Sequence, residues 1–173
     1  MSTRISSLSM RTTVPSTTSP CLKLLMSESC SASNSSIVVG SGPIRIGQGI
    51  EFDYCSVRAA WAIRDLGYDA VVINNNPETV STDYDACSRL YFEPLDTESV
   101  LDVLDHERAL TGEPPLVLLT FGGQTAIDLA RDLAYADVPV AGLTADAIEA
   151  CEDRDRFAAL LDSLGLEGPT GRL

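Results

Sequence analysis

Lysine is absent from residue 36 to the end of the chain, where every basic residue other than His106 is an arginine. The whole 173-residue chain holds 12 Lys and Arg against 25 Asp and Glu, a formal net charge of -13. An acidic surface repels a phosphate backbone, so we expect no nucleic-acid partner. The composition fits either a GC-rich codon bias with a solvated surface or a salt-adapted cytoplasm.

Long apolar runs and metal-binding residues are lacking as well. No uninterrupted apolar run approaches the roughly 20 residues that span a bilayer, so the sequence gives no support to a membrane role. The five cysteines form no CxxC pair, and with a single histidine they offer no plausible zinc set. A reduced cytoplasm is the simplest setting for such cysteines, and we predict a cytoplasmic location.

Residues 1–35 differ from the rest of the chain. Nearly half of them are Ser or Thr, and they show no hydrophobic periodicity. Such a segment buries too little apolar surface to offset its ordering entropy, so we predict a disordered Ser/Thr-rich extension. A transit peptide and a non-functional extension are both compatible with this composition.

From residue 36 onward, short apolar runs alternate with helical patterns. Strands are predicted at 36–39, 70–73, 90–92, 116–119 and 138–141. Helices are predicted from Asp53 to Leu66, from Asp96 or Thr97, over 125–134, and from Thr144 and Asp153. This alternation indicates an α/β fold: a three-layer, Rossmann-like domain with a parallel sheet of about five strands, in the order 3-2-1-4-5.

The glycine loop after the first strand invites comparison with a dinucleotide site. Gly40 and Gly42 are followed by Gly47, however, which is too late for the GxGxxG fingerprint. Pro43 removes an N–H that a phosphate cradle would use. The second strand ends in three asparagines beginning at Asn74, where that fingerprint calls for an acid. The sequence therefore disfavours NAD binding.

Five strings carry a resemblance to a known family. They are GPIRIGQGIEFDYC at 42–55, NNNPETVSTDYD at 74–85, RLYFEPL at 89–95, FGGQTAIDLA at 121–130 and CEDRDRFAALLDSLG at 151–165. Together they resemble the domain that precedes the ATP-grasp in carbamoyl-phosphate synthase large subunits. RIGQGIEFDYC and NPETVSTDYD look like the second, carbamate-phosphorylating half. Ile44 departs from the pattern, because an asparagine is common there.

The resemblance implies a pre-ATP-grasp domain over 36–168 and a truncated linker at 169–173, leading toward a missing ATP-grasp domain. It implies a part of an ATP-dependent carbon–nitrogen ligase that makes carbamoyl phosphate for arginine and pyrimidine synthesis. ATP and Mg²⁺ would belong to the complete enzyme and not to this chain, which we expect to be inactive alone. The implied partners are the remainder of the large subunit and the glutaminase small subunit.

The resemblance also implies roles for particular residues. Arg45, Gly49, Glu51 and Glu78 would line a carbamate route, although the three charged residues could instead form an ion-pair network that orders the loops. Arg154 would contact the edge of the ATP site in the following domain. For this chain alone, a solvated Arg154 paired with Asp153 or Asp155 is the simpler interpretation. No catalytic or metal-binding residue is predicted.

A second function stays open at this stage. The two glycines of FGGQT, at the end of a strand and the start of a helix, have a geometry that attracts anions. The chain would then be a free-standing Rossmann-like module that binds a small anion or a nucleotide.

Overall fold

The computed structural model describes residues 34–44 and 49–168. Four strands form one parallel sheet in the order β3-β2-β1-β4. The strands are β1 (Ser35–Val39), β2 (Asp69–Ile73), β3 (Arg89–Tyr91) and β4 (Leu116–Leu118). The helices are α2 (Ile50–Asp65), the 3-10 turn η1 (Val80–Thr82), α3 (Thr97–Thr111), α4 (Gln124–Ile127), α5 (Ala130–Tyr135), α6 (Ala145–Glu152) and α7 (Arg154–Ser163).

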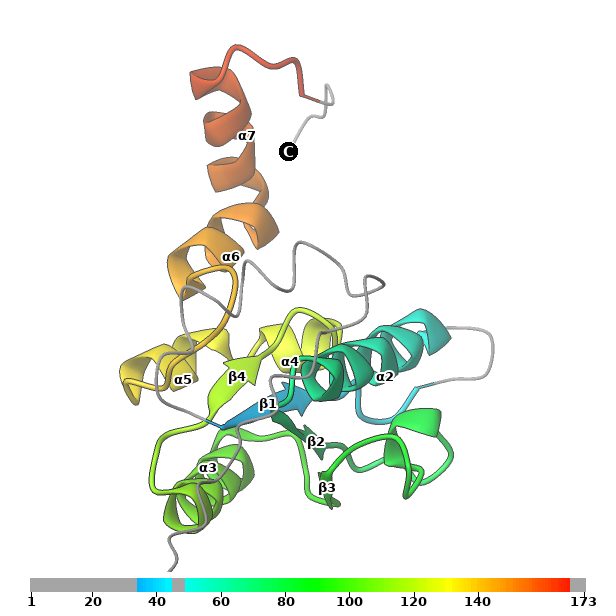
Figure 1. Ribbon diagram of the computed structural model, residues 1–173. Helices are drawn as coiled ribbons and strands as arrows, with labels where there is room; N and C mark the ends of the chain where they lie inside the picture. Colours follow the sequence, from blue (N-terminus) through cyan, green and yellow to red (C-terminus); the bar gives the residue numbers. More distant parts are fainter. Residues whose placement is uncertain (1–33, 45–48, 169–173) are drawn as a thin grey trace, which may run out of the picture.

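Helices cover both faces of the sheet, with α2 on one side and α3 on the other (Figure 1). The buried side chains divide by strand alternation, as the period of two requires. Ile37 and Val71 join the cluster that packs with α3 and α5, whereas Val38 and Val72 join the cluster that packs with α2. These two cores make the three-layer α/β fold that the sequence predicts.

The sheet has four strands where the sequence predicts about five. The predicted fifth strand at 138–141 lies beside β4 but forms only one bridge, between Val117 and Val140. The N–H of Val117 donates to the carbonyl of Pro139 at 2.9 Å. Proline has no N–H to extend the ladder, which explains the short pairing. The order 3-2-1-4 of the remaining strands is as predicted.

Helix boundaries show where local signals were sufficient. Asp96, Thr144 and Asp153 cap α3, α6 and α7 through their side chains, as expected. Asp53 does not cap α2, which begins at Ile50 after Gly49. The single helix predicted over 125–134 is divided into α4 and α5. No helix of the described residues is long and apolar enough to span a membrane.

Of the last two helices, α6 joins the core through Ile148, whereas α7 stands away from the sheet (Figure 1). Glu149 of α6 ties them together, because it pairs with Arg131 of α5 and with Arg156 of α7. No residue of α7 is buried. Phe157, Leu160 and Leu164 leave an apolar face of this helix exposed to solvent.

A buried ion cluster fixes the edge of the sheet at β3. The side chain of Glu107 is fully buried and accepts hydrogen bonds from Nε and Nη2 of Arg89, both at 2.8 Å. The hydroxyl of Tyr91 donates to the same carboxylate at 2.6 Å, and Arg89 also pairs with Asp69 at 2.8 Å. Every oxygen of the buried carboxylate is therefore satisfied, which makes its burial tolerable.

Within the cluster, the pKa values of Glu107, Tyr91 and Arg89 are shifted. Burial alone would raise the pKa of Glu107, but the hydrogen bonds from Arg89 and Tyr91 outweigh it and hold the pKa below its ordinary value of 4.5. Burial and the bond to Glu107 raise the pKa of Tyr91 to about 12. The hydrogen bond to Glu107 raises the pKa of Arg89. All three groups thus stay in their paired protonation states near neutral pH.

We expect Glu107→Gln to lower the free energy of unfolding by about 2–3 kcal/mol, since it leaves the partly solvated Arg89 with only Asp69 as an anionic partner. Because the pKa of Glu107 is lower in the folded state, its contribution is present above pH 4.5 and is lost as the pH falls through the folded value. Urea unfolding at pH 7 and below pH 4.5 measures the free energy of unfolding of wild type and variant. The difference between the two free energies should be smaller in acid than at pH 7.

The control for this measurement is the exposed Glu113, whose neutralisation to Gln should change stability by less than about 0.5 kcal/mol. A Glu107→Gln variant as stable as that control at pH 7 would show that the buried cluster does not stabilise the fold.

Candidate functional site at the carboxyl edge of the sheet

Three loops meet where strands β1, β2 and β4 end. They begin at Gly40, Asn74 and Leu119, directly after neighbouring parallel strands. The N–H of Gly40 donates to the carbonyl of Ile73 at 2.8 Å, which joins the first two loops at their base. Ligand sites in open α/β sheets form at this edge, and the predicted route residues Gly49, Glu51 and Glu78 follow these same strand ends.

Asn74 ties the glycine loop to the segment that follows β2. Its buried side-chain oxygen accepts the N–H of Gly42 at 3.1 Å. Its amide nitrogen donates to Ser81 Oγ at 3.0 Å and to Thr79 Oγ1 at 3.3 Å. An amide supplies both the acceptor and the donors that this position uses, whereas an ionised acid would supply only acceptors. The asparagine that lowers the prospect of a dinucleotide site thus has a structural task here.

Two glycines allow the loops to approach closely. A Cβ on Gly122 would lie 2.4 Å from the carbonyl oxygens of both Val39 and Gly40. A Cβ on Gly40 would lie 2.8–2.9 Å from side-chain atoms of Asn74. The β1 and β4 loops therefore pack backbone against backbone, which only glycine permits.

Asp53 positions the loop after β2. The residue is 4% exposed, and its carboxylate accepts the N–H groups of Val80 at 2.9 Å and Ser81 at 3.1 Å. It thereby satisfies the free donors at the start of η1, although it stands in the first turn of α2. Asp53 pins the turn that follows Glu78 against α2.

The glycine loops enclose an open hollow of about 280 Å³. It is lined by Ser41, Pro43, Ile44, Gly49, Phe52, Gly122, Gly123, Gln124 and Thr125. Among the described residues, this lining carries no charged side chain, in a chain whose net charge is -13. Ser41 is only 5% exposed, and its hydroxyl has no hydrogen-bond partner among the described residues. Such a lining admits a small polar molecule without placing it against a carboxylate.

The predicted route residues lie at and beside this hollow. Gly49 lines it, has a φ of 88° and stands immediately before α2. Glu51 is exposed in the first turn of α2, and the exposed Glu78 leads into η1. Neither carboxylate forms an ion pair with another residue of the described chain. Arg45 lies outside the described residues, so the proposed ion-pair network stays a prediction.

Arg154 lies elsewhere. It is the first residue of α7, which stands away from the sheet (Figure 1). Its side chain is exposed and forms no ion pair with Asp153 or Asp155 among the described residues. Asp153 accepts the N–H of Arg156 at 2.8 Å. The predicted site residues thus form two groups: one around the glycine loops, the other on the projecting helix.

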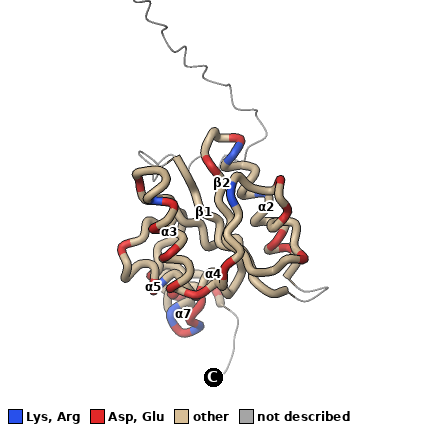
Figure 2. The backbone as a smooth tube through the Cα atoms, turned by 90° about the horizontal axis from the view of Figure 1, so that it is seen from below, with Lys and Arg blue, Asp and Glu red and all other residues tan. Residues whose placement is uncertain are grey.

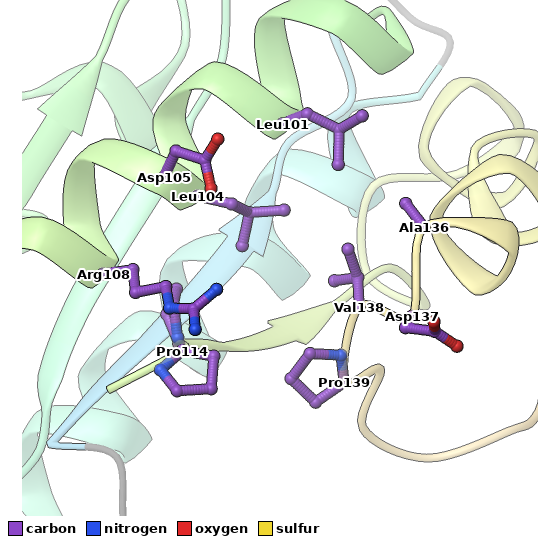
Figure 3. Close-up of a pocket in the computed structure, with 10 residues that line it drawn as sticks. Leu101, Leu104, Asp105, Arg108, Pro114, Ala136, Asp137, Val138 and Pro139 are labelled. Carbon is purple, nitrogen blue, oxygen red and sulfur yellow. The ribbon is translucent and has the colours of Figure 1, made fainter. Parts of the chain in front are cut away.

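A second hollow, of about 120 Å³, lies at the opposite edge of the sheet. Figure 3 shows Leu101, Leu104 and Arg108 of α3 on one side and Val138 and Pro139 on the other. Prolines 114 and 115, which precede β4, form part of its wall. Arg108 stands in the last turn of α3, where a cation complements the helix dipole, so it is accounted for without a ligand.

Sequence reasoning missed several residues that build the site. Asn74 and Phe52 lie in two of the quoted strings, at 74–85 and 42–55, but neither of them was assigned a role in the site from the sequence. Gln124 and Thr125 also line the hollow, where Gly123 occupies the N-cap of α4 and the Gln124 amide donates to Asp128 at 2.8 Å. Within the described residues, no group of three or more His, Cys, Asp or Glu side chains is placed to hold a metal.

The fold and this edge define a Rossmann-like domain whose loops after β1, β2 and β4 converge. Residues 32–150 match the family model described as "Carbamoyl phosphate synthase preATP-grasp domain". The chain belongs to this family.

Similar proteins are large chains of one enzyme. The chain is 60% identical over 136 residues to the carbamoyl phosphate synthase large chain of Thermomicrobium roseum, covering 78% of this chain and 13% of that protein. It is 53% identical over 133 residues to the carbamoyl phosphate synthase large chain, C-terminal section, of Methanopyrus kandleri, covering 77% and 24%. The chain therefore spans well under a third of the length of either relative.

A solved structure, an L-amino acid ligase from Bacillus licheniformis, superposes with a TM-score of 0.46 at 17% identity, over 79% of this chain and 31% of that one. A likeness at this level bears on neither the site nor the function.

Proposed function

We propose that the chain is a structural part of the second half of a carbamoyl-phosphate synthase large subunit, with no catalytic activity of its own. Identity of 60% to one large chain supports the enzyme. The similarity to a chain named as a C-terminal section supports the second half, together with the strings RIGQGIEFDYC and NPETVSTDYD. The complete enzyme would make carbamoyl phosphate from bicarbonate, glutamine-derived ammonia and ATP, in the cytoplasm, for arginine and pyrimidine synthesis.

The domain's task in this proposal is to form part of a carbamate route. The observation that carries it is Gly49, which lines an uncharged hollow at the sheet edge with its backbone alone. A small anion passes such a wall without meeting a buried carboxylate, while Glu51 and Glu78 stay outside the lining and face solvent. Arg45, from the same loop, would add a positive charge beside the route.

The projecting helix α7 would attach the domain to the ATP-grasp region. Its exposed Phe157, Leu160 and Leu164 recur at helical spacing on one face, and an unpartnered apolar face of this kind indicates a packing surface. Arg154, free of ion pairs in the described chain, would then stand at the edge of the ATP site. ATP and Mg²⁺ would be held by that neighbouring region, and the glutaminase small subunit would supply ammonia.

We expect the isolated chain to form no carbamoyl phosphate. Phosphoryl transfer needs a phosphate cage and a metal site, and the described residues provide no metal-binding cluster. The assay supplies ammonia, bicarbonate and MgATP, and it traps any product as citrulline with ornithine transcarbamylase. Product above the no-protein blank would contradict the proposal.

The hollow also favours a second candidate function, a free-standing module that binds a small anion or a nucleotide. Within the described residues, the hydroxyl of Ser41 has no partner and the lining carries no charge, and these are the observations in its favour. Titrating the isolated chain with inorganic phosphate and with ATP, followed by amide NMR, separates the two functions. Saturable shifts at Ser41 and Gly122–Thr125 at micromolar concentration would favour the module over the structural part.

A further inference from the structure

Five large apolar side chains are exposed on α2 and on the turn beside it, and together they are named the α2 ridge. The ridge consists of Ile50, Tyr54 and Trp61 of α2 and of Val80 and Tyr84 of the neighbouring segment. The three α2 residues are four and seven positions apart, which places them on one face of the helix. Tyr84 is 96% exposed, Ile50 68% and Tyr54 65%, so the ridge is open to solvent in the described structure.

Hydrogen bonds hold the two halves of the ridge side by side. At one end, the buried carboxylate of Asp53 accepts the N–H of Val80 at 2.9 Å. At the other end, Arg64 donates to the carbonyl of Asp85 at 2.9 Å. The segment from Val80 to Asp85 is therefore fixed along α2. A rigid surface of this kind binds without the entropy cost of ordering a loop.

The exposed residues of the ridge are large apolar side chains. Single exposed apolar residues are ordinary, but five large exposed side chains on two adjoining segments, three of them aromatic, mark an interaction surface. Tyrosine and tryptophan are also the residues that most often carry the binding energy of such surfaces. The ridge is accordingly better explained by a partner than by the needs of this fold.

Acidic groups flank the ridge. Glu51, Glu78, Asp83 and Asp85 are all exposed on the two segments that carry it. The two arginines of α2 are engaged, since Arg58 stacks 5.8 Å from the centre of the Trp61 ring and Arg64 binds a backbone carbonyl. Figure 2 shows acidic positions, in red, on α2 and on most other parts of the chain. An apolar centre with an acidic border suits a partner of the reverse charge.

We propose that the α2 ridge docks a polypeptide surface with an apolar centre and a border of lysine or arginine. A second copy of this chain does not fit, because the same face would set four carboxylates against four others. Nucleic acid and anionic lipid are opposed by the same charges. The inference does not depend on the carbamate route, because binding is measured without any catalytic readout.

Trp61 is the only tryptophan of the chain, so its fluorescence reports binding at the ridge directly. We would titrate the isolated chain with three synthetic helical peptides of equal length. One is built from Leu and Lys, the second from Ser and Lys, and the third from Leu and Glu. We expect the Leu/Lys peptide to bind at least about tenfold more tightly than either of the others, since it alone supplies both the apolar and the basic groups.

Matched variants separate the ridge from the overall charge. Tyr54→Ser combined with Tyr84→Ser should weaken the Leu/Lys peptide at least about tenfold. Tyr135→Ser, at the 81% exposed tyrosine of α5, should leave its affinity within about twofold. Far-ultraviolet circular dichroism checks that each variant is folded. Should the double variant fail to fold, Tyr84→Ser alone carries the comparison, because its side chain is almost fully in solvent.

Three results would overturn the proposal. Equal binding of the Ser/Lys peptide would mean that net charge alone is at work. Equal binding of the Leu/Glu peptide would mean that the acidic border selects nothing. Self-association of the chain that is lost in the double variant would make a second copy the occupant.

Discussion

Gly122→Ala should destabilise the domain by about 3 kcal/mol or more, the upper end of the overpacking range. The added Cβ would lie 2.4 Å from two backbone carbonyl oxygens, of Val39 and Gly40, and 2.6 Å from the Cβ of Ala126. Backbone atoms at the end of β1 cannot move aside without breaking strand pairing. Since the total stability of a domain is only about 5–15 kcal/mol, a large share would be lost.

Thermal unfolding followed by circular dichroism measures this effect. We expect the midpoint of Gly122→Ala to fall by roughly 10 °C or more. Gly112→Ala is the matched control: Gly112 has a φ of 82°, but no atom lies within 4 Å of the added Cβ. That change costs only about 1 kcal/mol of left-handed strain. If Gly122→Ala melted no lower than Gly112→Ala, the close packing of the β1 and β4 loops would not be a feature of the protein.

The strands were predictable because burial on both faces leaves a simple mark in the sequence. The runs Ile37–Val39 and Val71–Ile73 are continuously apolar and β-branched, since their alternate residues enter two different cores. The N-cap residues Asp96 and Asp153 were also predictable, because each side chain accepts a hydrogen bond from a backbone N–H of the helix that directly follows it. Local chemistry decided these elements.

What the sequence did not predict depends on contacts between distant segments. Asp53 has the composition signal of a cap for α2, yet its carboxylate binds η1, nearly thirty residues away. Asn74 hydrogen-bonds both the glycine loop and the η1 segment, and this role is visible only once the fold has brought the two segments together. The predicted fifth strand is reduced to a single bridge at Val140. The strand propensity of its valines favoured a full strand, but this propensity takes no account of the N–H that Pro139 lacks. Tertiary contacts settled these positions.

The position of the candidate site was predicted in part, whereas the roles of its residues stay predictions. The loops that carry Gly49, Glu51 and Glu78 do lie at one edge of the sheet, because parallel strands place their ends together. The uncharged lining of the hollow was not foreseen, since the sequence emphasises the charges of these same loops. Phe52 of α2 lines the hollow, and its ring lies 3.0 Å from the position that a Cβ on Gly123 would take.

Gly49→Leu is the change that tests the proposed carbamate route. A Cβ at Gly49 would lie 3.2 Å from Ile44, the φ of 88° strains any other residue, and a leucine would place its bulk where the hollow opens. Gly67→Leu is the control: Gly67 has a φ of 87° at the other end of α2 and no atom within 4 Å of the added Cβ. Both variants thus carry similar backbone strain, but only the first narrows the hollow.

The direct measurement is made on the complete large subunit that contains this domain, with the two ATP-dependent partial reactions assayed separately from overall synthesis. For Gly49→Leu we predict partial reactions within about twofold of wild type and overall synthesis reduced by about tenfold or more, equivalent to about 1.4 kcal/mol. Gly67→Leu should leave all three rates near normal. If both partial reactions fell together with overall synthesis in Gly49→Leu alone, the loop would be supporting the fold and not a route for carbamate.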